Sequence, residues 1–537
     1  MCGILLHYSD KIANYDEETF GNDKLFKSLV PIIRDRGNDY ENYKKILNNK
    51  IELYSSVLSL RQPLVEQPLI DNRFVIQFNG ELYNDEILSN MNDVEFLHSK
   101  LKLNNNNIIK TIGQLIGEFA YSIIDKLENK IYFGKDIIGR KSLTYSLDLN
   151  NELYISSCPP FDNKFKLNFI ECKNASIYCY NLNEKNLNIL SFDDDINLPK
   201  SFKVLNDFKE DINIEKLHKQ LSKSVYKRIS TIFPLKDETN NSKFAILFSG
   251  GIDCTIIAGL CGEICENGTI IDLLNVSFSN PRANLNYDET PDRKLAIENC
   301  NELNKKYNIK GIQFKLIKIN VSFEDYNKAR ENVINLIYPN NTEMDLSIAI
   351  AFYFASSGKS NIDNNDSKCK VLLSGLGADE LFGGYTRHER IFTGISNQIK
   401  RKLKNKPIND NTIYDLKELN IELRDELQID LDRLWERNLT RDDKVISCWS
   451  KEVRYPFLDE NFIKWVTTEG NVPLNWKLNF NQLNGEIIRK KALRELAEKS
   501  LGLSFVANEP KRAIQFGSKS AKMEIGSGKV KGTDKLV

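Results

Sequence analysis

One short apolar segment constrains the fold of this chain more than any other feature. Residues Phe244–Phe248 form a continuous apolar run that leads into Ser249-Gly250-Gly251 and then into a helical pattern at Thr255–Ile264. A strand that is apolar on both faces needs helices on both sides of its sheet, which is the arrangement of parallel sheets. Two further apolar runs, Ile271–Phe278 and Val371–Leu373, alternate with helical patterns. We therefore predict a parallel α/β sheet in the C-terminal part of the chain.

The first 185 residues carry a different pattern. Short β-rich runs alternate there with clusters of Gly, Asn and Asp, which predicts strands joined by turns. These runs are Lys50–Leu60, Phe74–Phe78, Ala120–Ile124, Lys130–Gly134 and Glu152–Ser156. A polar, acidic stretch at 186–207 predicts a linker. We expect one domain at 2–185, a second at 208–523 and a disordered tail at 524–537.

Helical patterns dominate the second domain. The expected helices are Ile212–Ile229, Pro291–Lys306, Ser322–Leu336, Leu416–Trp449 and Asn484–Leu501. A basic run, Lys400–Lys404, precedes Pro407. We interpret this run as a solvated helix face, with a nuclear or RNA-contact patch as the less favoured alternative.

Composition argues against several classes of protein. The 537 residues include 74 Lys and Arg and 74 Asp and Glu, and zero net charge argues against a whole-chain footprint on nucleic acid or a membrane. The longest apolar candidate, Ile348–Ala355, has the length of a core helix and not of a membrane span. Ten Cys without dense spacing indicate cytosolic thiols, and no secretory signal is visible. We interpret Cys254, Cys261 and Cys265 as buried small hydrophobes, with zinc ligands as the less favoured alternative.

The turn after the first apolar strand has the chemistry of a phosphate-binding loop. Gly250 and Gly251 let backbone amides face outward, and the following helix presents its positive end to an anion. Ser249 adds a hydroxyl donor, and Asp253 can hold Mg²⁺ beside phosphates. The loop lacks the final Lys of a Walker A motif, and the Gly-Lys-Ser at 358–360 lacks the required Gly upstream. We predict an ATP pyrophosphate site, with an ordinary strand-to-helix turn as the alternative.

A second turn of the same kind follows the apolar run Val371–Leu373. Gly375 and Gly377 allow close approach of a nucleotide or an acyl group. Asp379 provides a second carboxylate for Mg²⁺, and two carboxylates around one triphosphate are what adenylation needs. Two such turns after parallel strands favour an enzyme that activates its substrate with ATP.

The N-terminus carries a candidate nucleophile. If Met1 is removed, Cys2 holds a thiol and an α-amine, and a pKa of about 7.7–8 lets that amine act as the base for its own side chain. Asn79 and the Gly80 amide suit an oxyanion hole, although an Asn-Gly dipeptide alone also fits a hairpin turn. Asp93 is a candidate anchor for a substrate ammonium.

These residues, together with Arg36–Asp39, Asn79–Asn84 and Phe133–Asp136, resemble the class II glutamine amidotransferase domain. The resemblance implies an α+β N-terminal-nucleophile sandwich of two antiparallel sheets with flanking helices. It also implies that Cys2 attacks the glutamine amide and releases ammonia through a thioester, with Asn79 and Gly80 as its catalytic helpers. The implied glutamine-binding residues are Asn79, Glu81 and Asp93.

One position departs from that family. Val57 stands where the family has an Arg that grips the glutamine α-carboxylate. Such a charge-assisted hydrogen bond is worth about 1.5–3 kcal/mol, or ~10–150-fold in affinity. Arg61 lies four residues later and is a candidate substitute. We expect weak glutamine binding unless Arg61 reaches the pocket.

The two phosphate-type turns resemble the synthetase domain of glutamine-hydrolysing asparagine synthetases, an adenine-nucleotide α-hydrolase-like fold with an α/β parallel sheet. The segments Arg437–Lys444 and Lys451–Asp459 add to that resemblance. Lys511 matches a late Lys of the family that stabilises the adenylate-forming transition state. The implied ATP-binding residues are Leu247, Ser249, Gly250, Gly251, Asp253, Phe278, Ser374 and Gly375, and the implied Mg²⁺ ligands are Asp253 and Asp379.

Three positions depart from the synthetase pattern. Leu376 stands where the family has a Glu, the expected general base, and a Leu cannot move a proton. Asp345 aligns with a nucleotide-contacting Arg, and Cys254 replaces a Ser. We therefore expect amide formation to be impaired more than adenylation.

These features predict a glutamine-dependent, ATP-consuming amide ligase. The implied reaction converts aspartate, glutamine and ATP into asparagine, glutamate, AMP and pyrophosphate through an acyl-adenylate. Two alternatives stay open, another carboxylate acceptor or a non-catalytic nucleotide-binding or interaction protein, given Val57 and Leu376. The expected cofactors are ATP and Mg²⁺, and the expected partners are glutamine and an aspartate-like acid, without nucleic acid or a membrane. We expect a cytoplasmic protein, and a homodimer is one assembly that the sequence leaves open.

Overall fold

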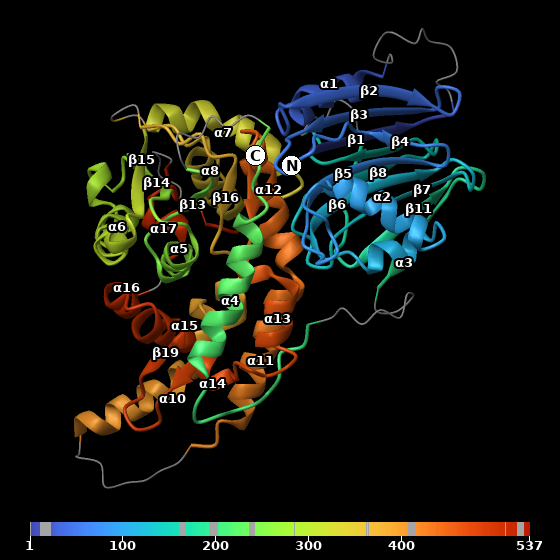
Figure 1. Cartoon of the computed structure of the whole chain (residues 1–537). Helices are drawn as coiled ribbons and strands as arrows, with labels where there is room; N and C mark the ends of the chain where they lie inside the picture. The colour runs from blue at the N-terminus through green and yellow to red at the C-terminus, as the bar shows by residue number, and fades with distance from the viewer. Residues whose placement is uncertain are drawn as a thin grey trace.

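The computed structural model describes residues 2–10, 23–160, 167–192, 202–235, 242–283, 285–360, 362, 365–405, 414–510, 512–523 and 531–536. Within these ranges the chain forms an N-terminal domain of two antiparallel sheets and a C-terminal domain built on a parallel sheet. Figure 1 shows the two domains side by side, with the N-terminal sheets in blue to cyan and the mainly helical remainder in green to red. Residues 193–201 of the predicted linker and 524–530 of the predicted tail lie outside the described residues.

The N-terminal domain contains two six-stranded sheets in which every pairing is antiparallel. The first has the order β10-β8-β9-β1-β3-β2 and consists of β1 (Cys2–Tyr8), β2 (Tyr40–Ile46), β3 (Ile51–Val57), β8 (Thr144–Leu147), β9 (Leu153–Ser156) and β10 (Ile170–Glu171). The second has the order β12-β11-β7-β6-β5-β4 and consists of β4 (Leu69–Ile70), β5 (Phe74–Leu82), β6 (Gly117–Asp125), β7 (Lys130–Lys135), β11 (Ser176–Asn181) and β12 (Asn186–Ser191).

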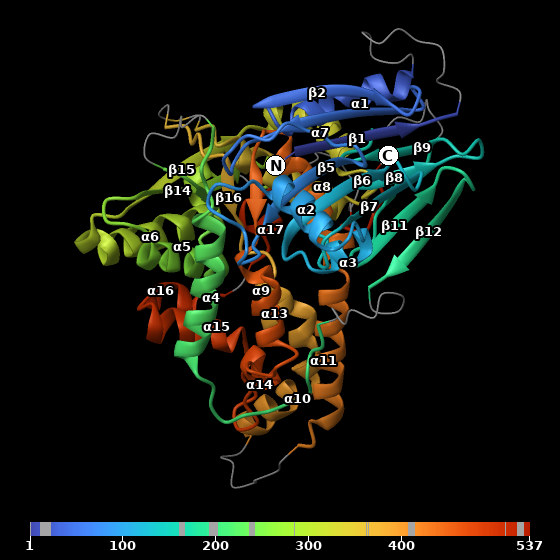
Figure 2. The ribbon, with the colours of Figure 1, turned by 45° about the vertical axis from the view of Figure 1, so that its right-hand side comes forward.

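The two sheets pack face to face around a shared core. Ile4 and Leu6 of β1 join Ile124 of β6 and Phe133 of β7 in one fully buried cluster. Outside these layers, α1 (Lys24–Arg34) packs against β1 and β3, α2 (Asp93–Leu103) packs against β5, and α3 (Ile108–Gly113) follows α2. Figure 2 shows the sheets as stacked layers between these helices. The arrangement places the N-terminal residue of β1 at the edge of the domain that faces the rest of the chain (Figure 1).

The second sheet extends beyond residue 185, where the sequence predicts the domain to end. Residues 186–191, predicted as the start of the linker, form β12, and Ser191 pairs opposite Ser176 of β11. β12 is an edge strand with half-buried or exposed residues, so it needs few apolar side chains. A polar edge strand has the composition of a linker, which is why the sequence pattern did not distinguish the two.

The C-terminal domain is built on a five-stranded sheet with the order β15-β14-β13-β16-β17. Its strands are β13 (Ala245–Leu247), β14 (Ile270–Phe278), β15 (Gln313–Val321), β16 (Val371–Leu373) and β17 (Glu452–Arg454). All four pairings are parallel, so the predicted parallel sheet is confirmed. Because β13 and β16 are neighbours, the two glycine-containing turns that follow them lie at the same edge of the sheet.

Helices cover this sheet and form the rest of the domain. Around the sheet lie α4 (Ile214–Ile229), α5 (Ile252–Ile264), α6 (Pro291–Tyr307), α7 (Phe323–Ile337) and α8 (Glu343–Ser357), with the 3₁₀ turns η2 (Tyr287–Glu289) and η3 (Asn308–Lys310). Ser322 caps α7 as the sequence predicts, since its Oγ accepts a hydrogen bond from the Asp325 N–H at 3.0 Å. Among the described helices, none is both long and apolar enough to cross a membrane.

The last third of the chain is mainly helical. It contains α9 (Ala378–Phe382), α10 (Thr386–Asn405), α11 (Lys417–Asp432), the π-helix η4 (Trp435–Leu439), α12 (Thr440–Ser447), η5 (Pro456–Leu458), α13 (Glu460–Val466), α14 (Leu474–Lys477), α15 (Lys491–Glu495), the π-helix η6 (Leu496–Ser500), α16 (Ser504–Asn508) and α17 (Ile514–Gly517). The expected single helix over 416–449 is therefore divided by η4. Residues 487–489, expected in a helix, form β19 (Ile487–Arg489) and pair with β18 (Leu478–Phe480), which suits the β-branched pair Ile487-Ile488.

The described part of the predicted tail lies against α8. Gly532 O accepts a hydrogen bond from the Met344 N–H at 2.9 Å, and the Leu536 N–H donates to Asn341 O at 2.7 Å. Backbone hydrogen bonds make this contact. The amino-acid composition of the tail, on which the prediction of disorder rests, does not indicate such bonds. The basic run Lys400–Lys404 is exposed at the end of α10, in agreement with a solvated helix face.

Candidate active sites

Cys2 is the first residue of β1 and lies opposite Val57 of β3. It is 7% exposed, and its backbone N–H donates to Asn79 Oδ1 at 2.8 Å. The other end of that amide, Asn79 Nδ2, is buried and has no hydrogen-bond partner in the described residues. One N–H donor beside the nucleophile is thus available to an oxyanion.

Gly80 follows Asn79 at a position that excludes a side chain. Its φ is +136°, and a Cβ atom would lie 1.9 Å from Glu118 O. The structure therefore brings Cys2, Asn79 and Gly80 together at the junction of the two sheets.

Arg61 lies across the two carboxylates that the sequence assigns to glutamine binding. Its Nη2 donates to Glu81 Oε2 at 2.8 Å, and its Nε is 3.4 Å from Asp93 Oδ2. Asp93 Oδ1 also accepts a hydrogen bond from the Leu82 N–H at 2.8 Å. Burial raises the pKa of Asp93 to about 7, and Glu81 adds to that rise while Arg61 opposes it. Arg61 thus brings a cation to this pocket, whereas Val57 is a buried apolar residue of β3.

The surroundings of the Cys2 thiol disfavour its ionised form. Burial raises the pKa of this thiol, and the carboxylates of Glu452 and Asp93 raise it further. The positive charge of the N-terminus lowers the pKa and is the largest opposing cause, and a backbone hydrogen bond from Leu58 also lowers it. A reactive thiolate at this position therefore depends on that positive charge and on nearby N–H donors.

A cavity of about 230 Å³ lies at the edge of the parallel sheet where β13 and β16 end. Six of the predicted ATP-binding residues line it: Leu247, Ser249, Gly251, Asp253, Ser374 and Gly375. Gly250 is not among the lining residues and lets the loop pack closely against α6. Its φ is +77°, and a Cβ atom there would lie 2.3 Å from Ala296 N. Phe278 packs edge-on against Tyr326 and Phe354 in the core and is not among the lining residues.

The first turn of α5 faces this cavity. Gly251 is its N-cap and provides no side-chain cap, so the first backbone N–H groups are left for a ligand. The Gly251 N–H contacts Ser249 Oγ at 3.3 Å, and Cys254 Sγ donates to Gly251 O at 3.2 Å. Cys254 therefore supports the loop from the position where the family has a Ser.

Lys490 contacts two residues of the cavity lining, Asp253 and Asp379, and the sequence analysis missed it. Its Nζ lies 2.7 Å from Asp253 Oδ2 and 2.5 Å from Asp379 Oδ1. Burial lowers the pKa of Lys490, but the two carboxylates outweigh burial and the pKa is raised. Gly384 makes room for this contact, because a Cβ atom there would lie 1.9 Å from Asp379 Oδ1 and 2.2 Å from Lys490 Cε. Lys490 stands in the run Arg489-Lys490-Lys491, where the sequence alone does not distinguish its role.

The two carboxylates fit the predicted role of magnesium ligands. They come from different loops and converge on one point, which the ammonium of Lys490 now neutralises. No group of three or more His, Cys, Asp or Glu side chains in the described ranges forms an all-protein metal site. Mg²⁺ in nucleotide sites commonly uses one or two carboxylates together with substrate phosphates, and Asp253 and Asp379 match that donor set.

Leu376 lines the cavity where the family has a Glu. Glu380 in α9 is a buried carboxylate whose Oε1 accepts from Tyr385 Oη at 2.6 Å and from Asn438 Nδ2 at 3.0 Å. Burial raises the pKa of Glu380 to about 7, with Asp379 as the next cause. Tyr385 and Asn438 line the cavity, so Glu380 connects to it through them.

Arg441 is a buried cation in the cavity wall. Its Nε donates to Asp442 Oδ1 at 2.8 Å, and its Nη1 donates to Asp345 Oδ1 at 3.2 Å. Asp345 stands at the position that aligns with an Arg of the family. In this chain its carboxylate pairs with the guanidinium of Arg441. Lys511 lies outside the described residues, whereas its neighbours Pro510 and Arg512 line the cavity.

The strand β17 contacts both sites. Arg454 Nη2 lies 2.9 Å from Glu81 Oε1 in the N-terminal domain, and its Nε donates to Glu452 at 2.7 Å. The backbone carbonyl of Arg454 accepts a hydrogen bond from the Ser374 N–H at 3.0 Å, and Ser374 lines the cavity beside β13 and β16. Lys141 of the N-terminal domain donates to Val453 O at 2.9 Å. One residue, Arg454, thus connects the two candidate sites.

Asp443 and Lys444, which match the synthetase pattern, face the N-terminal domain. Asp443 Oδ2 accepts from Arg36 Nη2 at 2.8 Å and from Ser142 Oγ at 2.7 Å, and Lys444 Nζ donates to Glu171 at 3.0 Å. Burial would raise the pKa of Asp443, but the neighbouring guanidinium of Arg36 holds it below its usual range. Both residues therefore bind side chains of the N-terminal domain across the domain interface.

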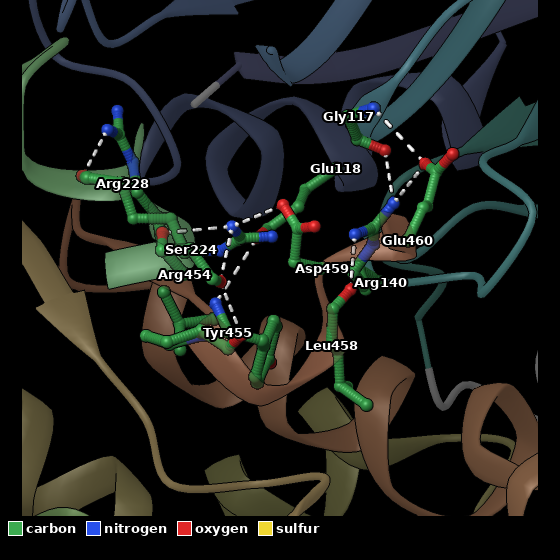
Figure 3. A network of polar contacts seen from close by, with 12 residues as sticks. Gly117, Glu118, Arg140, Ser224, Arg228, Arg454, Tyr455, Leu458, Asp459 and Glu460 are labelled. Carbon is green, nitrogen blue, oxygen red and sulfur yellow. Dashed lines mark hydrogen bonds and ion pairs between the residues drawn. The ribbon is translucent and has the colours of Figure 1, made fainter. Parts of the chain in front are cut away.

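Figure 3 shows further buried contacts beside β17. Arg228 of α4 donates to Glu118 at 2.8 Å and to Asp459 at 3.0 Å, and Arg140 donates to Glu460 at 2.9 Å. Both arginines are fully buried. Loss of one partner would leave a buried charge unpaired, so these pairs resist separation of the two domains.

Comparison with known proteins agrees with this architecture. The family model described as asparagine synthase matches residues 239–529, and the one described as glutamine amidotransferase domain matches residues 56–161. The chain is 39% identical to asparagine synthetase domain-containing protein YML096W of Saccharomyces cerevisiae, over 100% of this chain and 99% of that protein. It is 27% identical to human asparagine synthetase domain-containing protein 1, over 98% and 96%, and 23% identical to asparagine synthetase [glutamine-hydrolyzing] of Sandersonia aurantiaca, over 77% and 68%.

The family resemblance inferred from the two glycine turns and the segment 451–459 is therefore confirmed. With a family match over more than half of its length and a 39% identical relative aligned from end to end, the chain belongs to the asparagine synthase family.

Proposed function

We propose that the protein is a glutamine-dependent amide ligase. The N-terminal domain hydrolyses glutamine to glutamate and ammonia. The C-terminal domain joins a carboxylate to AMP, and ammonia then displaces AMP to form an amide. The observation that carries this proposal is the position of Arg454, whose side chain contacts Glu81 beside Cys2 and whose carbonyl contacts Ser374 at the ATP cavity.

The glutaminase step uses the side chains around Cys2. The thiolate attacks the amide carbon, and Asn79 Nδ2, which lacks a partner in the described residues, donates to the oxyanion. Ammonia leaves, and water hydrolyses the thioester to glutamate. Asp93 and Glu81 receive the substrate ammonium, and Arg61 receives its α-carboxylate. The α-amine of Cys2, once Met1 is removed, serves as the base.

The ligase step uses the cavity beside β13 and β16. Ser249 and the first amides of α5 hold the phosphates, and the acceptor carboxylate attacks the α-phosphorus so that pyrophosphate leaves. Asp253 and Asp379 would hold Mg²⁺, which would supply positive charge to the phosphates. Lys490 lies between these carboxylates and neutralises them until the nucleotide and its cation bind, and we assign Lys511 an electrostatic role in stabilising the transition state. Ammonia then attacks the acyl carbon and AMP leaves.

The proposed acceptor is aspartate, which would give asparagine. A different carboxylate is the second candidate, because Leu376 lines the cavity with an apolar side chain where the family has a Glu.

We also propose an N-terminal-nucleophile fold for residues 2–185, extended by β12, and an adenine-nucleotide α-hydrolase-like fold for residues 208–523. The stacked antiparallel sheets support the first assignment, and the parallel sheet with its glycine turns supports the second. We propose a cytoplasmic location, which all ten cysteines support because none is in a disulfide.

ATP–pyrophosphate exchange with a panel of carboxylic acids tests the proposed function. Exchange that depends on aspartate supports asparagine synthesis, and exchange that depends on another acid supports the second acceptor. Nucleotide binding without exchange for any acid would overturn the ligase proposal. Mass spectrometry of reactions with ¹⁵N-amide glutamine then identifies the amide product and the origin of its nitrogen.

A further inference from the structure

Gln67 is a buried residue whose side chain contacts the sulfur of Cys2. It lies between β3 and β4 and is 3% exposed. Its Nε2 is 3.3 Å from Cys2 Sγ, and its Oε1 accepts a hydrogen bond from the Phe78 N–H at 2.7 Å. The sequence analysis did not single it out, because a lone Gln before a Pro carries no motif.

The contact with Phe78 fixes which end of the amide faces the sulfur. A backbone N–H can only donate, so the oxygen of the Gln67 amide has to face Phe78. The NH₂ group therefore has to face Cys2. The usual ambiguity between the two ends of a glutamine amide is removed by this geometry.

A donor at this place has a chemical consequence for the thiol. Burial opposes the ionisation of Cys2, as do the two buried carboxylates of Asp93 and Glu452, whereas the positive charge of the N-terminus favours it. Hydrogen bonds to the charged form favour ionisation, and bonds to a charged acceptor are stronger than neutral ones. Gln67 and the Leu58 N–H are the donors that the structure offers to the sulfur.

We propose that Gln67 is a catalytic residue of the glutaminase step, where it donates to Cys2 Sγ and stabilises the thiolate. This inference rests on the proposed function for the role of that thiolate. The S–H proton goes to the base, the sulfur forms the bond to the amide carbon, and Gln67 stays neutral. The C–N bond then breaks, the base gives its proton to the leaving nitrogen, and ammonia departs. When water attacks the thioester, the new C–O bond forms, the C–S bond breaks, and the sulfur leaves as a thiolate that again accepts the Gln67 N–H. A proton from the attacking water returns to the base.

Two substitutions separate this role from a structural one. Gln67→Glu keeps an oxygen for the Phe78 N–H but replaces the donor by an acceptor beside the sulfur. Gln67→Met keeps the length of the side chain and removes both polar ends. The matched control is Gln77→Met, since Gln77 is also buried and donates to Leu5 O and Tyr54 O, with no contact to Cys2 among its hydrogen bonds.

The experiment measures alkylation of Cys2 by iodoacetamide in the full chain as a function of pH, with peptide mass spectrometry to isolate Cys2 from the other cysteines. We expect both Gln67 variants to move the midpoint to higher pH and to slow alkylation at pH 7 by about tenfold or more, with Gln67→Glu the slower. Glutaminase kcat falls by about the same factor, while the KM for glutamine changes by less than about twofold, because Gln67 contacts the sulfur. Gln77→Met keeps the wild-type alkylation profile.

A wild-type alkylation profile in a folded Gln67 variant would overturn the proposal. If Gln67→Met does not fold, Gln67→Glu decides, because it retains the bond to Phe78. A third outcome is slower alkylation of Cys2 in the Gln67 variants than in the wild-type chain, together with no glutaminase activity in the wild-type chain. That result would contradict the proposed function and would still support Gln67 as a donor to the sulfur. The two failures are therefore distinguishable.

Discussion

The two candidate sites differ in how their buried charges are balanced. At the Cys2 site, Glu81 contacts Arg61 from its own domain and Arg454 from the other domain. At the ATP cavity, Asp253 and Asp379 share the ammonium of a single lysine from the same domain. The carboxylate of Glu81 in the proposed glutamine site thus depends on the domain interface, whereas Asp253 and Asp379 in the proposed ATP cavity are held by one side chain that a ligand can displace.

This difference gives the two sites different sensitivities. Arg454 is fully buried with Glu81 and Glu452, and breaking a buried pair of this kind commonly costs about 3–5 kcal/mol. Lys490 sits beside a cavity, and the charge that it provides can be replaced by a cation that arrives with the nucleotide. We therefore expect the glutamine pocket to be rigid and the ATP cavity to rearrange when it binds its ligand.

The largest expected effect separates the two sites completely. Cys2→Ala should reduce glutaminase activity to background, a loss of roughly 10⁴-fold or more, because it removes the nucleophile. Amide formation supported by added ammonia should persist, since the ATP cavity contains no part of the Cys2 site. Steady-state assays with glutamine and with ammonium chloride measure both activities.

Cys179→Ala is the matched control, because Cys179 is a half-buried thiol of β11. It should leave both activities unchanged. Loss of ammonia-dependent turnover in a well-folded Cys2→Ala protein would show that the two sites do not divide the work.

The next effect concerns the missing base at the ATP cavity. A general base contributes about 10²–10⁴ in rate, so amide formation should be slow in the natural chain while ATP–pyrophosphate exchange persists. Leu376→Glu should raise ammonia-dependent amide formation by about 10² or more. Leu376 is only partly buried and lines the cavity, so a carboxylate there would contact water and remain ionised.

Leu376→Gln is the control with the same size and no proton to exchange, and it should not restore the rate. Mass spectrometry of the amide product measures the effect. Rapid synthesis by the unmodified chain, at tens of turnovers per second, would show that the family Glu is dispensable and would direct attention to Glu380 and Tyr385.

The third effect is on nucleotide affinity. Asp379→Asn removes one of the two charges that face Lys490, so Mg²⁺-dependent ATP binding should weaken by about 10–100-fold. Asp415→Asn is the control, because Asp415 is exposed and far from the cavity lining. Calorimetry with and without Mg²⁺ gives the affinities. No Mg²⁺-dependent ATP binding by the wild-type chain at millimolar ATP would favour the non-catalytic alternative.

The sequence predicted the ATP cavity better than the glutamine pocket. Ser249, Asp253 and Asp379 stand in glycine-containing turns after apolar strands, and parallel strands bring such turns to one edge. Lys490 was not predictable in this way, because it reaches the same point from a segment more than 100 residues later with no local signal of its own. Position in a turn is encoded locally, whereas a counter-charge from a distant segment is set by tertiary packing.

The N-terminal domain illustrates the same limit. The alternation of β-rich runs with turn clusters predicted five of its strands. It did not predict β12, whose residues fit a linker, because an exposed edge strand needs few apolar residues. Cys2, Asn79 and Gly80 could be named from motifs. Gln67 could not, because its role depends on the two contacts that fix its amide, and both partners are distant in sequence.

A smaller effect tests which arginine serves the glutamine pocket. Arg61→Met should raise the KM for glutamine by about tenfold, because it removes the cation beside Glu81 and Asp93. Val57→Arg should not lower the KM, since Val57 is buried within β3 and Arg61 already occupies the pocket. Arg73→Met is the control, because Arg73 pairs with Asp125 elsewhere in the same domain. A large drop in KM for Val57→Arg would show that Arg61 does not reach the substrate.

The smallest expected effect is a pH dependence of the KM for glutamine. Burial, with Glu81 as the next cause, raises the pKa of Asp93 to about 7, so its carboxyl is neutral below pH 7 and charged above it. A neutral carboxyl attracts the substrate ammonium less, so the KM for glutamine should rise as pH falls from 8 to 6, by up to about tenfold.

Initial rates over a range of glutamine concentrations separate this change in KM from changes in kcat, which also follow the ionisation of Cys2. Asp93→Asn should have a high KM for glutamine that no longer varies with pH. A flat KM for glutamine in the wild-type chain would mean that Arg61, 3.4 Å from Asp93, keeps this carboxylate charged throughout the range and outweighs its burial.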